Sequence, residues 1–138
     1  MPPPLSAALA DAHDTNYADF STSYARRPGS DLRRSTSLDR SIIDLPALPY
    51  NGVFRSNLHR SDIASVAAET LALARARRVP VAWRVTPTSP PHTTAALETL
   101  GWHAQWHSPV MATELSAATP ARTRPDVTVE EVTTTALA

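Results

Sequence analysis

The sequence contains no cysteine and no lysine, and it has only three glycines among 138 residues. Without cysteine it can form no disulfide, no zinc–thiolate site and no cysteine nucleophile. Gly29, Gly52 and Gly101 leave few places for a glycine-rich loop that brings backbone N–H groups close to a phosphate. These absences exclude several classes of site before any motif is considered.

An excess of charge of either sign is also lacking. Thirteen arginines, the only strongly basic residues, balance thirteen acidic residues. A chain with no net charge has no field that would draw it onto nucleic acid, so we expect no nucleic-acid partner. The arginines have two interpretations, phosphate recognition and codon bias. The abundance of Ala, Pro and Thr beside Arg favours codon bias.

Long hydrophobic runs are missing as well. No apolar run approaches the roughly 18 residues that a membrane-spanning helix needs. Met1-Pro2-Pro3-Pro4 does not begin a signal peptide, because no basic segment followed by an apolar segment is present. We therefore expect a cytoplasmic protein with no membrane partner. Hydrophobic residues make up 42% of the chain, which predicts a globular domain with a core.

The apolar periodicity predicts two main helices. Residues 62–78 carry the strongest helical pattern, with Ser61 as the expected N-cap and Pro80 beyond the end. Residues 12–26 carry a weaker pattern, which stops before Pro28-Gly29. Three aromatic residues fall on one face of this weaker helix: Tyr17, Phe20 and Tyr24.

The segment from Trp83 to Trp102 predicts a strand, a turn and a capped helix. Residues 81–85 are rich in strand-forming side chains, and residues 86–89 turn the chain. Ser89 is the expected N-cap of the following helix, with Pro90 as its first residue. Gly101 occupies the position just after the end of that helix.

Shorter patterns complete the organisation of the chain. Four further runs are β-prone: residues 38–45, 53–58, 102–106 and 110–115. Residues 1–11 are an expected disordered lead-in, and residues 116–126 an expected polar linker. Residues 127–138 begin a new strand and helix that cannot close a core by themselves. We therefore predict one α+β domain over residues 12–115, followed by the start of an incomplete second domain.

Four motifs carry a resemblance to a known family. They are Asn51-Gly52-Val53, Trp83-Arg84-Val85-Thr86-Pro87-Thr88-Ser89-Pro90, Leu97-Glu98-Thr99-Leu100-Gly101-Trp102 and Met111-Ala112-Thr113-Glu114-Leu115. With the order helix, two strands, helix, strand, helix, two strands, they resemble the N-terminal half of two-domain bacterial GNAT acetyltransferase-like proteins. Val127-Thr128-Val129-Glu130-Glu131-Val132 looks like the first strand of the second GNAT-like domain. The resemblance implies a mixed, mostly antiparallel sheet flanked by helices.

The resemblance also locates the cofactor loop of the family. GNAT domains hold the pyrophosphate of acetyl-CoA on an Arg/Gln-x-x-Gly-x-Gly/Ala loop at a helix start, where bare N–H groups and the helix dipole bind the anion. Aligned by element order, this loop is degenerate here and lacks glycine: Leu58, His59, Arg60, Ser61 and Asp62. A partial match at residues 26–31 follows a helix instead of preceding one and lacks the final Gly/Ala. We therefore expect no cofactor on this chain, with acetyl-CoA bound only in the complete family protein.

The second functional position of the family is a tyrosine that protonates the leaving CoA thiolate. The matching residue here is Leu97, which cannot donate a proton. The resemblance thus implies no catalytic residue in this chain. In a divergent enzyme, Tyr17, Tyr24 or Tyr50 could supply the missing proton.

Histidines and paired carboxylates do not predict a metal site. His103 and His107 are four residues apart, but the pattern around them favours a strand, in which the two rings lie too far apart to share an ion. Glu130 and Glu131 are adjacent and would point to opposite faces of a strand. We therefore expect no metal ligands.

Three functions are open from the sequence. The resemblance favours a non-catalytic N-terminal half of an N-acetyltransferase, which packs on an acetyl-CoA-binding C-terminal half and shapes its acceptor cleft. The second is a divergent stand-alone acyltransferase that acts on a small amine. The third is a binding module, in which Trp83, Trp102 and Trp106 line an interface instead of a core. The expected partner is a C-terminal GNAT domain or a second copy of the chain.

Overall fold

The computed structural model describes residues 6–105 and 107. This part of the chain is α+β, as expected. Its α-helices and strands follow one another as α1 (Ala7–Ser23), β1 (Asp31–Arg34), β2 (Leu38–Ile42), β3 (Gly52–Ser56), α2 (Arg60–Arg77), β4 (Ala82–Trp83) and α3 (Thr93–Thr99). Two short 3₁₀ turns, η1 (Tyr24–Arg26) and η2 (Leu48–Tyr50), lie after α1 and before β3. The expected strand at 110–115, the linker and the second-domain segment lie outside the described residues.

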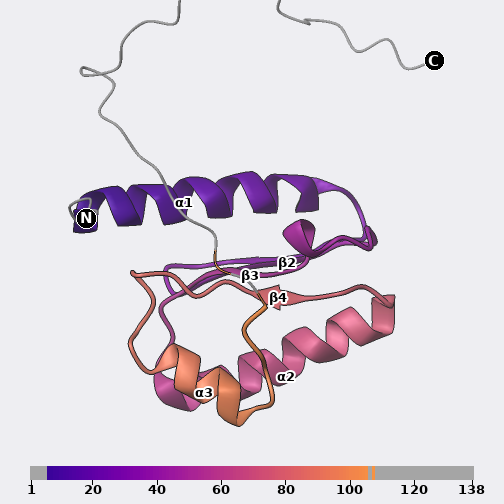
Figure 1. The fold of residues 1–138 in the computed structure, drawn as a ribbon. Helices are drawn as coiled ribbons and strands as arrows, with labels where there is room; N and C mark the ends of the chain where they lie inside the picture. Colours follow the sequence, from indigo (N-terminus) through magenta and orange to yellow (C-terminus); the bar gives the residue numbers. More distant parts are fainter. Residues whose placement is uncertain (1–5, 106, 108–138) are drawn as a thin grey trace, which may run out of the picture. The chain divides into compact units, whose positions relative to one another are not determined.

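The elements form three layers, with the sheet between α1 on one side and α2 with α3 on the other (Figure 1). The strand order is β1-β2-β3-β4. β1 with β2 and β2 with β3 are antiparallel, whereas β3 and β4 are parallel. The expectation of a mixed, mostly antiparallel sheet flanked by helices is therefore confirmed. No helix in residues 6–105 is long and apolar enough to cross a membrane.

Strand β1 is the element that the sequence does not predict. Leu32, Arg33 and Arg34 are exposed, so the strand has no alternation of apolar and polar residues to mark it. It pairs with β2 from Asp31 opposite Ile42 to Arg34 opposite Asp39. Its charged side chains suit an edge strand, because they discourage pairing with another chain.

The hydrophobic core lies between the sheet and α2. Its buried members come from β2, β3, α2, α3 and the loop before α2: Leu38, Val53, Leu58, Ile63, Val66, Ala67 and Leu97. Trp83 and Trp102 pack against this cluster, partly buried, with their rings edge to face at 6.0 Å between centroids. These two tryptophans are core residues, and Trp106 lies outside the described residues.

Helix α1 differs from its prediction at its start and in its buried face. It begins at Ala7, because the Ser6 side chain caps it by accepting a hydrogen bond from Leu9 N–H at 3.3 Å. Residues 7–11 are therefore helical and do not belong to a disordered lead-in. The buried face consists of small or polar residues: Ala10, Asp14, Ala18, Ser21 and Thr22. Phe20 of the predicted aromatic face is 57% exposed.

Asn51 and Gly52 hold the start of β3. Gly52 has φ 149°, and a Cβ placed there would lie 1.9 Å from Ala82 O, so only glycine lets β4 approach β3 at this point. The buried Asn51 amide accepts a hydrogen bond from Ile43 N–H at 2.8 Å and donates to Leu45 O at 2.6 Å. The Asn-Gly motif thus has a structural role.

The segment after β3 departs from the prediction in two places. β4 comprises two residues instead of the expected five, and it pairs with β3 only at Gly52–Ala82 and Val53–Trp83. Residues 102–105 form no strand, although residues 102–106 were expected to form one. The edge-to-face contact with Trp83 and the hydrogen bond from Trp102 N–H to Leu97 O (3.1 Å) hold the chain at Trp102 instead.

Candidate functional site

The expected loop position is the start of α2. The helix begins at Arg60 with His59 as N-cap, so the prediction of Ser61 as N-cap is wrong. The extended backbone of His59 precedes the first turn, and its side chain makes no capping hydrogen bond. Ser61 Oγ instead donates to Asp62 Oδ1 at 3.1 Å and lies 3.4 Å from His59 Nδ1. His59, Arg60, Ser61 and Asp62 are all exposed.

This helix start carries its own anion. Asp62 lies in the first turn, where a carboxylate complements the positive end of the helix dipole. A phosphate that approached the same N–H groups would meet this carboxylate and the side chains on either side of it. The arrangement is an ordinary acid-bearing helix start, and its chemistry disfavours a second anion.

Leu97, at the position of the family's acid, is a core residue. It is 5% exposed and belongs to the same apolar cluster as Leu58, just before α2. His92 Nε2 lies 3.2 Å from Leu58 O, which ties the start of α3 to the loop before α2. Leu97 therefore serves packing, whereas residues 59–62 at the α2 start are exposed and form an ordinary helix end.

The start of α3 also differs from the prediction. The helix begins at Thr93 with His92 as N-cap, so Ser89 does not cap it. Ser89 Oγ accepts a hydrogen bond from Thr86 N–H at 3.0 Å and closes the turn at residues 86–89. Gly101 has φ 83° directly after the C-cap Leu100, which confirms the expected glycine at the helix end.

The three tyrosines considered as replacement acids lie away from Leu97. Tyr17 belongs to α1, on the opposite side of the sheet from α3 (Figure 1). Tyr24 and Tyr50 pack edge to face at 4.7 Å between centroids, in the 3₁₀ turns η1 and η2. No tyrosine of the described residues thus joins the α2 start and Leu97 in one site.

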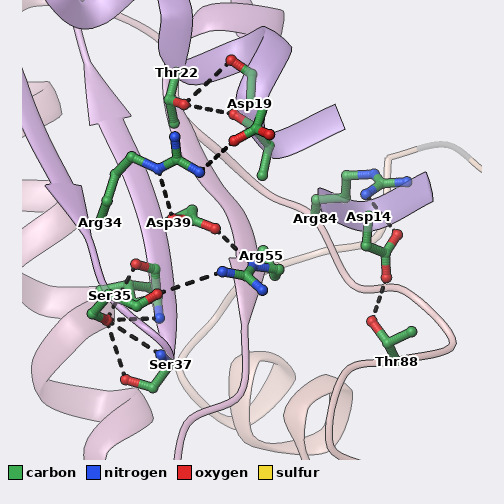
Figure 2. A network of polar contacts seen from close by, with 12 residues as sticks. Asp14, Asp19, Thr22, Arg34, Ser35, Ser37, Asp39, Arg55, Arg84 and Thr88 are labelled. Carbon is green, nitrogen blue, oxygen red and sulfur yellow. Dashed lines mark hydrogen bonds and ion pairs between the residues drawn. The ribbon is translucent and has the colours of Figure 1, made fainter. Parts of the chain in front are cut away.

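A polar cluster around Asp14 is the feature that the sequence analysis missed. The Asp14 carboxylate is 2% exposed and accepts hydrogen bonds from Arg84 Nη1 at 3.0 Å and from Thr86 Oγ1 at 2.6 Å. The hydroxyl of Thr88 donates to the same carboxylate (Figure 2). One side chain of α1 therefore holds the whole loop that follows β4.

His13 and Tyr17 complete this cluster. The Arg84 guanidinium lies 4.2 Å from the centre of the Tyr17 ring, a cation–π contact. Arg84 Nη2 is 3.2 Å from His13 Nδ1, whereas Asp14 Oδ1 is 3.4 Å from the same nitrogen. His13 Nδ1 therefore lies within hydrogen-bond distance of both members of the Arg84–Asp14 pair.

The surroundings of Asp14 favour its charged form. Burial by itself would raise the pKa of Asp14, but the hydrogen bonds with Thr86, Thr88 and His13 and the charge of Arg84 outweigh burial and lower the pKa. A carboxylate with a lowered pKa and three strong donors is a poor general base. The cluster is therefore suited to positioning and not to proton transfer.

A second buried carboxylate, Asp39, lies on the same side of the sheet. It accepts from Arg55 Nε at 2.7 Å and from Arg34 Nε at 3.1 Å (Figure 2). Arg34 also reaches Asp19 of α1, with 2.5 Å between Nη2 and Oδ1. This network links β1, β2, β3 and α1.

Arg40 provides the one buried cation among the described residues. Its Nη2 donates to Asp31 Oδ1 at 2.9 Å and to Glu69 Oε1 at 3.0 Å, which connects β2 with β1 and α2. Its Nε and Nη1 are buried without a partner in the described part of the chain. Burial opposes the charged form, but the bonds to Glu69 and Asp31 outweigh it and raise the pKa of Arg40. The ion pairs fix the register of β1 against β2.

The remaining candidates assemble no site. Residues 26–31 lead from the end of η1 into β1, with Gly29 at φ 84°, and they do not precede a helix. His103 and His107 are exposed. No three His, Asp or Glu side chains in residues 6–105 and 107 gather as a metal ion would require. Glu130 and Glu131 lie outside the described residues.

One signal could have revealed the Asp14 cluster. Ala10, Asp14 and Ala18 recur every four residues, which places the aspartate in the middle of the helix face that α1 buries.

The sequence and structure were compared with protein-family models, curated proteins and solved structures, and none of the three comparisons gave a match. The function of the chain must be argued from its own residues.

Proposed function

We propose that this chain is a non-catalytic GNAT-like half of an N-acetyltransferase, which packs on an acetyl-CoA-binding half and shapes its acceptor cleft. One observation carries the proposal. The positions that the resemblance assigns to the cofactor loop and to the catalytic acid hold residues that have structural roles in this chain. The α2 start holds its own carboxylate, Asp62, and the position of the acid holds the buried Leu97.

The order and pairing of the elements support the proposal. After α1 come strands, helix α2, strand β4 and helix α3, in the order of the resemblance except that three strands instead of two precede α2. The side of the sheet that carries α2 and α3 is filled by apolar side chains. The other side carries the Asp14 cluster, which keeps the loop after β4 in one position. A loop fixed in this way is suited to positioning a substrate held by another domain.

A calorimetric titration of acetyl-CoA into the purified chain tests the non-catalytic part. We expect no binding heat at micromolar concentrations, because an anion at the α2 start would face Asp62. A micromolar Kd would contradict the proposal and favour the divergent stand-alone acyltransferase. Far-ultraviolet circular dichroism of the same sample verifies that the protein titrated is folded.

A copurification experiment tests the packing part. A GNAT domain with an intact Arg/Gln-x-x-Gly-x-Gly/Ala loop, encoded beside this chain, should copurify with it and bind acetyl-CoA. Failure of such a domain to associate with this chain would contradict the packing part. The variant Leu97→Tyr is a useful control, since restoring only the acid should not restore acetyl-CoA binding to this chain.

A further inference from the structure

The interior face of α1 offers little hydrophobic surface to the sheet. All five of its buried residues are small or polar, and Ser21 Oγ is buried without a hydrogen-bond partner in the described part of the chain. Burial of small side chains removes little apolar surface from water, and an unpaired hydroxyl costs free energy. Apolar packing alone therefore holds α1 weakly.

Polar contacts supply what packing does not. The buried Asp14 binds Arg84, Thr86 and Thr88, all in the loop after β4. Arg84 also lies 4.2 Å from the centre of the Tyr17 ring and 3.2 Å from His13 Nδ1. The ion pair from Asp19 to Arg34 lies at the surface, where ion pairs contribute little. Asp14 is therefore the main attachment between α1 and the rest of the domain.

The connection of α1 to the sheet permits separate movement. Among the described residues the helix is covalently connected to the sheet only at its C-terminal end, through η1 and the turn at Gly29. The core cluster around α2 contains no residue of α1. Release of α1 would leave this cluster intact and would uncover Phe54, which is 4% exposed and packs near Tyr17 at 6.3 Å between ring centroids.

We propose that α1 opens from the sheet as a unit while the sheet stays folded with α2 and α3, and that Asp14 is the latch that keeps it closed. The opening is a conformational device of this fold. It does not depend on the proposed function, because neither the α2 start nor Leu97 takes part in it.

Hydrogen–deuterium exchange of the full chain, followed by mass spectrometry, tests the proposal. Amides of α1 should exchange about tenfold or more faster than those of α2 in the wild-type protein. In Asp14→Asn the neutral amide cannot hold Arg84 and both threonine hydroxyls equally well. Exchange in α1 should then rise by about another tenfold, while exchange in α2 stays unchanged.

Two further variants make the result unambiguous. Thr88→Val removes one donor to the latch and should raise α1 exchange by a smaller factor than Asp14→Asn. Ile63→Ala weakens the α2 core and should accelerate exchange in α2, whereas α1, which exchanges through its own opening, should change little. Equal exchange rates of α1 and α2 in the wild type, or equal acceleration of both in Asp14→Asn and Thr88→Val, would overturn the proposal.

Discussion

The two sides of the sheet are covered through different kinds of contact. The side under α2 and α3 is apolar, with Leu38, Val53 and Ile63 at its centre. The side under α1 buries small and polar groups, among them the carboxylates of Asp14 and Asp39. Three-layer proteins need to cover both faces of a sheet, but they need not do so by the same force.

The hydrophobic core and the buried carboxylates therefore lie on opposite sides of the sheet. The start of α2 and Leu97 lie on the apolar side, where Leu97 contributes to the core. The buried carboxylates of Asp14 and Asp39, each with specific partners, lie on the α1 side, and the buried Arg40 pairs with Glu69 on the α2 side. A sheet side that lacks a hydrophobic core depends on charged hydrogen bonds, so we expect it to respond to mutation and to acid in its own way.

The largest effect should come from the apolar side. Ile63→Ala removes a side chain that is 1% exposed and leaves a cavity in the cluster. The free energy of unfolding should fall by about 2–5 kcal/mol, as for other large-to-small core substitutions. Urea unfolding followed by tryptophan fluorescence measures the change. A loss below about 1 kcal/mol would mean that the core does not lie under α2.

On the α1 side, Asp14→Asn should lower the free energy of unfolding by less than Ile63→Ala does. It keeps the shape of the side chain and removes the charge that Arg84 pairs with, so we expect a loss of about 1–3 kcal/mol. Circular dichroism during urea unfolding measures it, because α1 contributes much of the helix signal. Asp11→Asn is the matched control at an exposed site of the same helix and should change the stability by less than about 0.5 kcal/mol. Equal losses in the two variants would show that the Asp14 cluster contributes nothing.

These two sides were not equally predictable from the sequence. The pattern of apolar residues at helical spacing located α2, and its core members fall on the expected face. Gly101 marked the end of α3 for a local reason, since the position needs a positive φ. On the α1 side, no local pattern reports that an aspartate will meet an arginine 70 residues away.

The incorrect predictions of the N-caps, of β1 and of the buried face of α1 have physical causes. Ser61 and Ser89 are good N-caps by type, but each hydroxyl is taken up by another partner, Asp62 or Thr86 N–H. The edge strand β1 lacks the apolar alternation of a half-buried strand. The identity of the buried face of α1 follows from the close approach of helix and sheet, which favours Ala10 and Ala18 over aromatic residues.

Acid should weaken the α1 side through Asp14. Because the folded-state pKa of Asp14 lies below its usual value of 3.8, the carboxylate contributes stability above that value. This contribution is lost as the pH falls through the lowered pKa. Arg84 and His13 are the other titratable groups that face Asp14, and Glu69, also with a lowered pKa, adds to the loss on the α2 side. Stability measured between pH 5 and 2 should therefore fall less steeply in Asp14→Asn than in the wild type.

The smallest effect should come from the outer face of α1. Phe20 is 57% exposed and contacts Tyr24 edge to face at 5.5 Å between centroids. Phe20→Ser should change the free energy of unfolding by less than about 0.5 kcal/mol, as is usual at the surface. Thermal unfolding followed by circular dichroism suffices to measure it. A loss comparable to that of Ile63→Ala would mean that Phe20 belongs to a core.

The claim that the two sides are held independently has one most direct test. In a Trp106→Phe background, Trp83 and Trp102 report the apolar side, and a fluorophore on Asn16→Cys, the single cysteine of the chain, reports α1. Urea unfolding followed with both probes should give two transitions, with α1 leaving the sheet at the lower urea concentration. A single shared transition with the same midpoint for both probes would contradict the account.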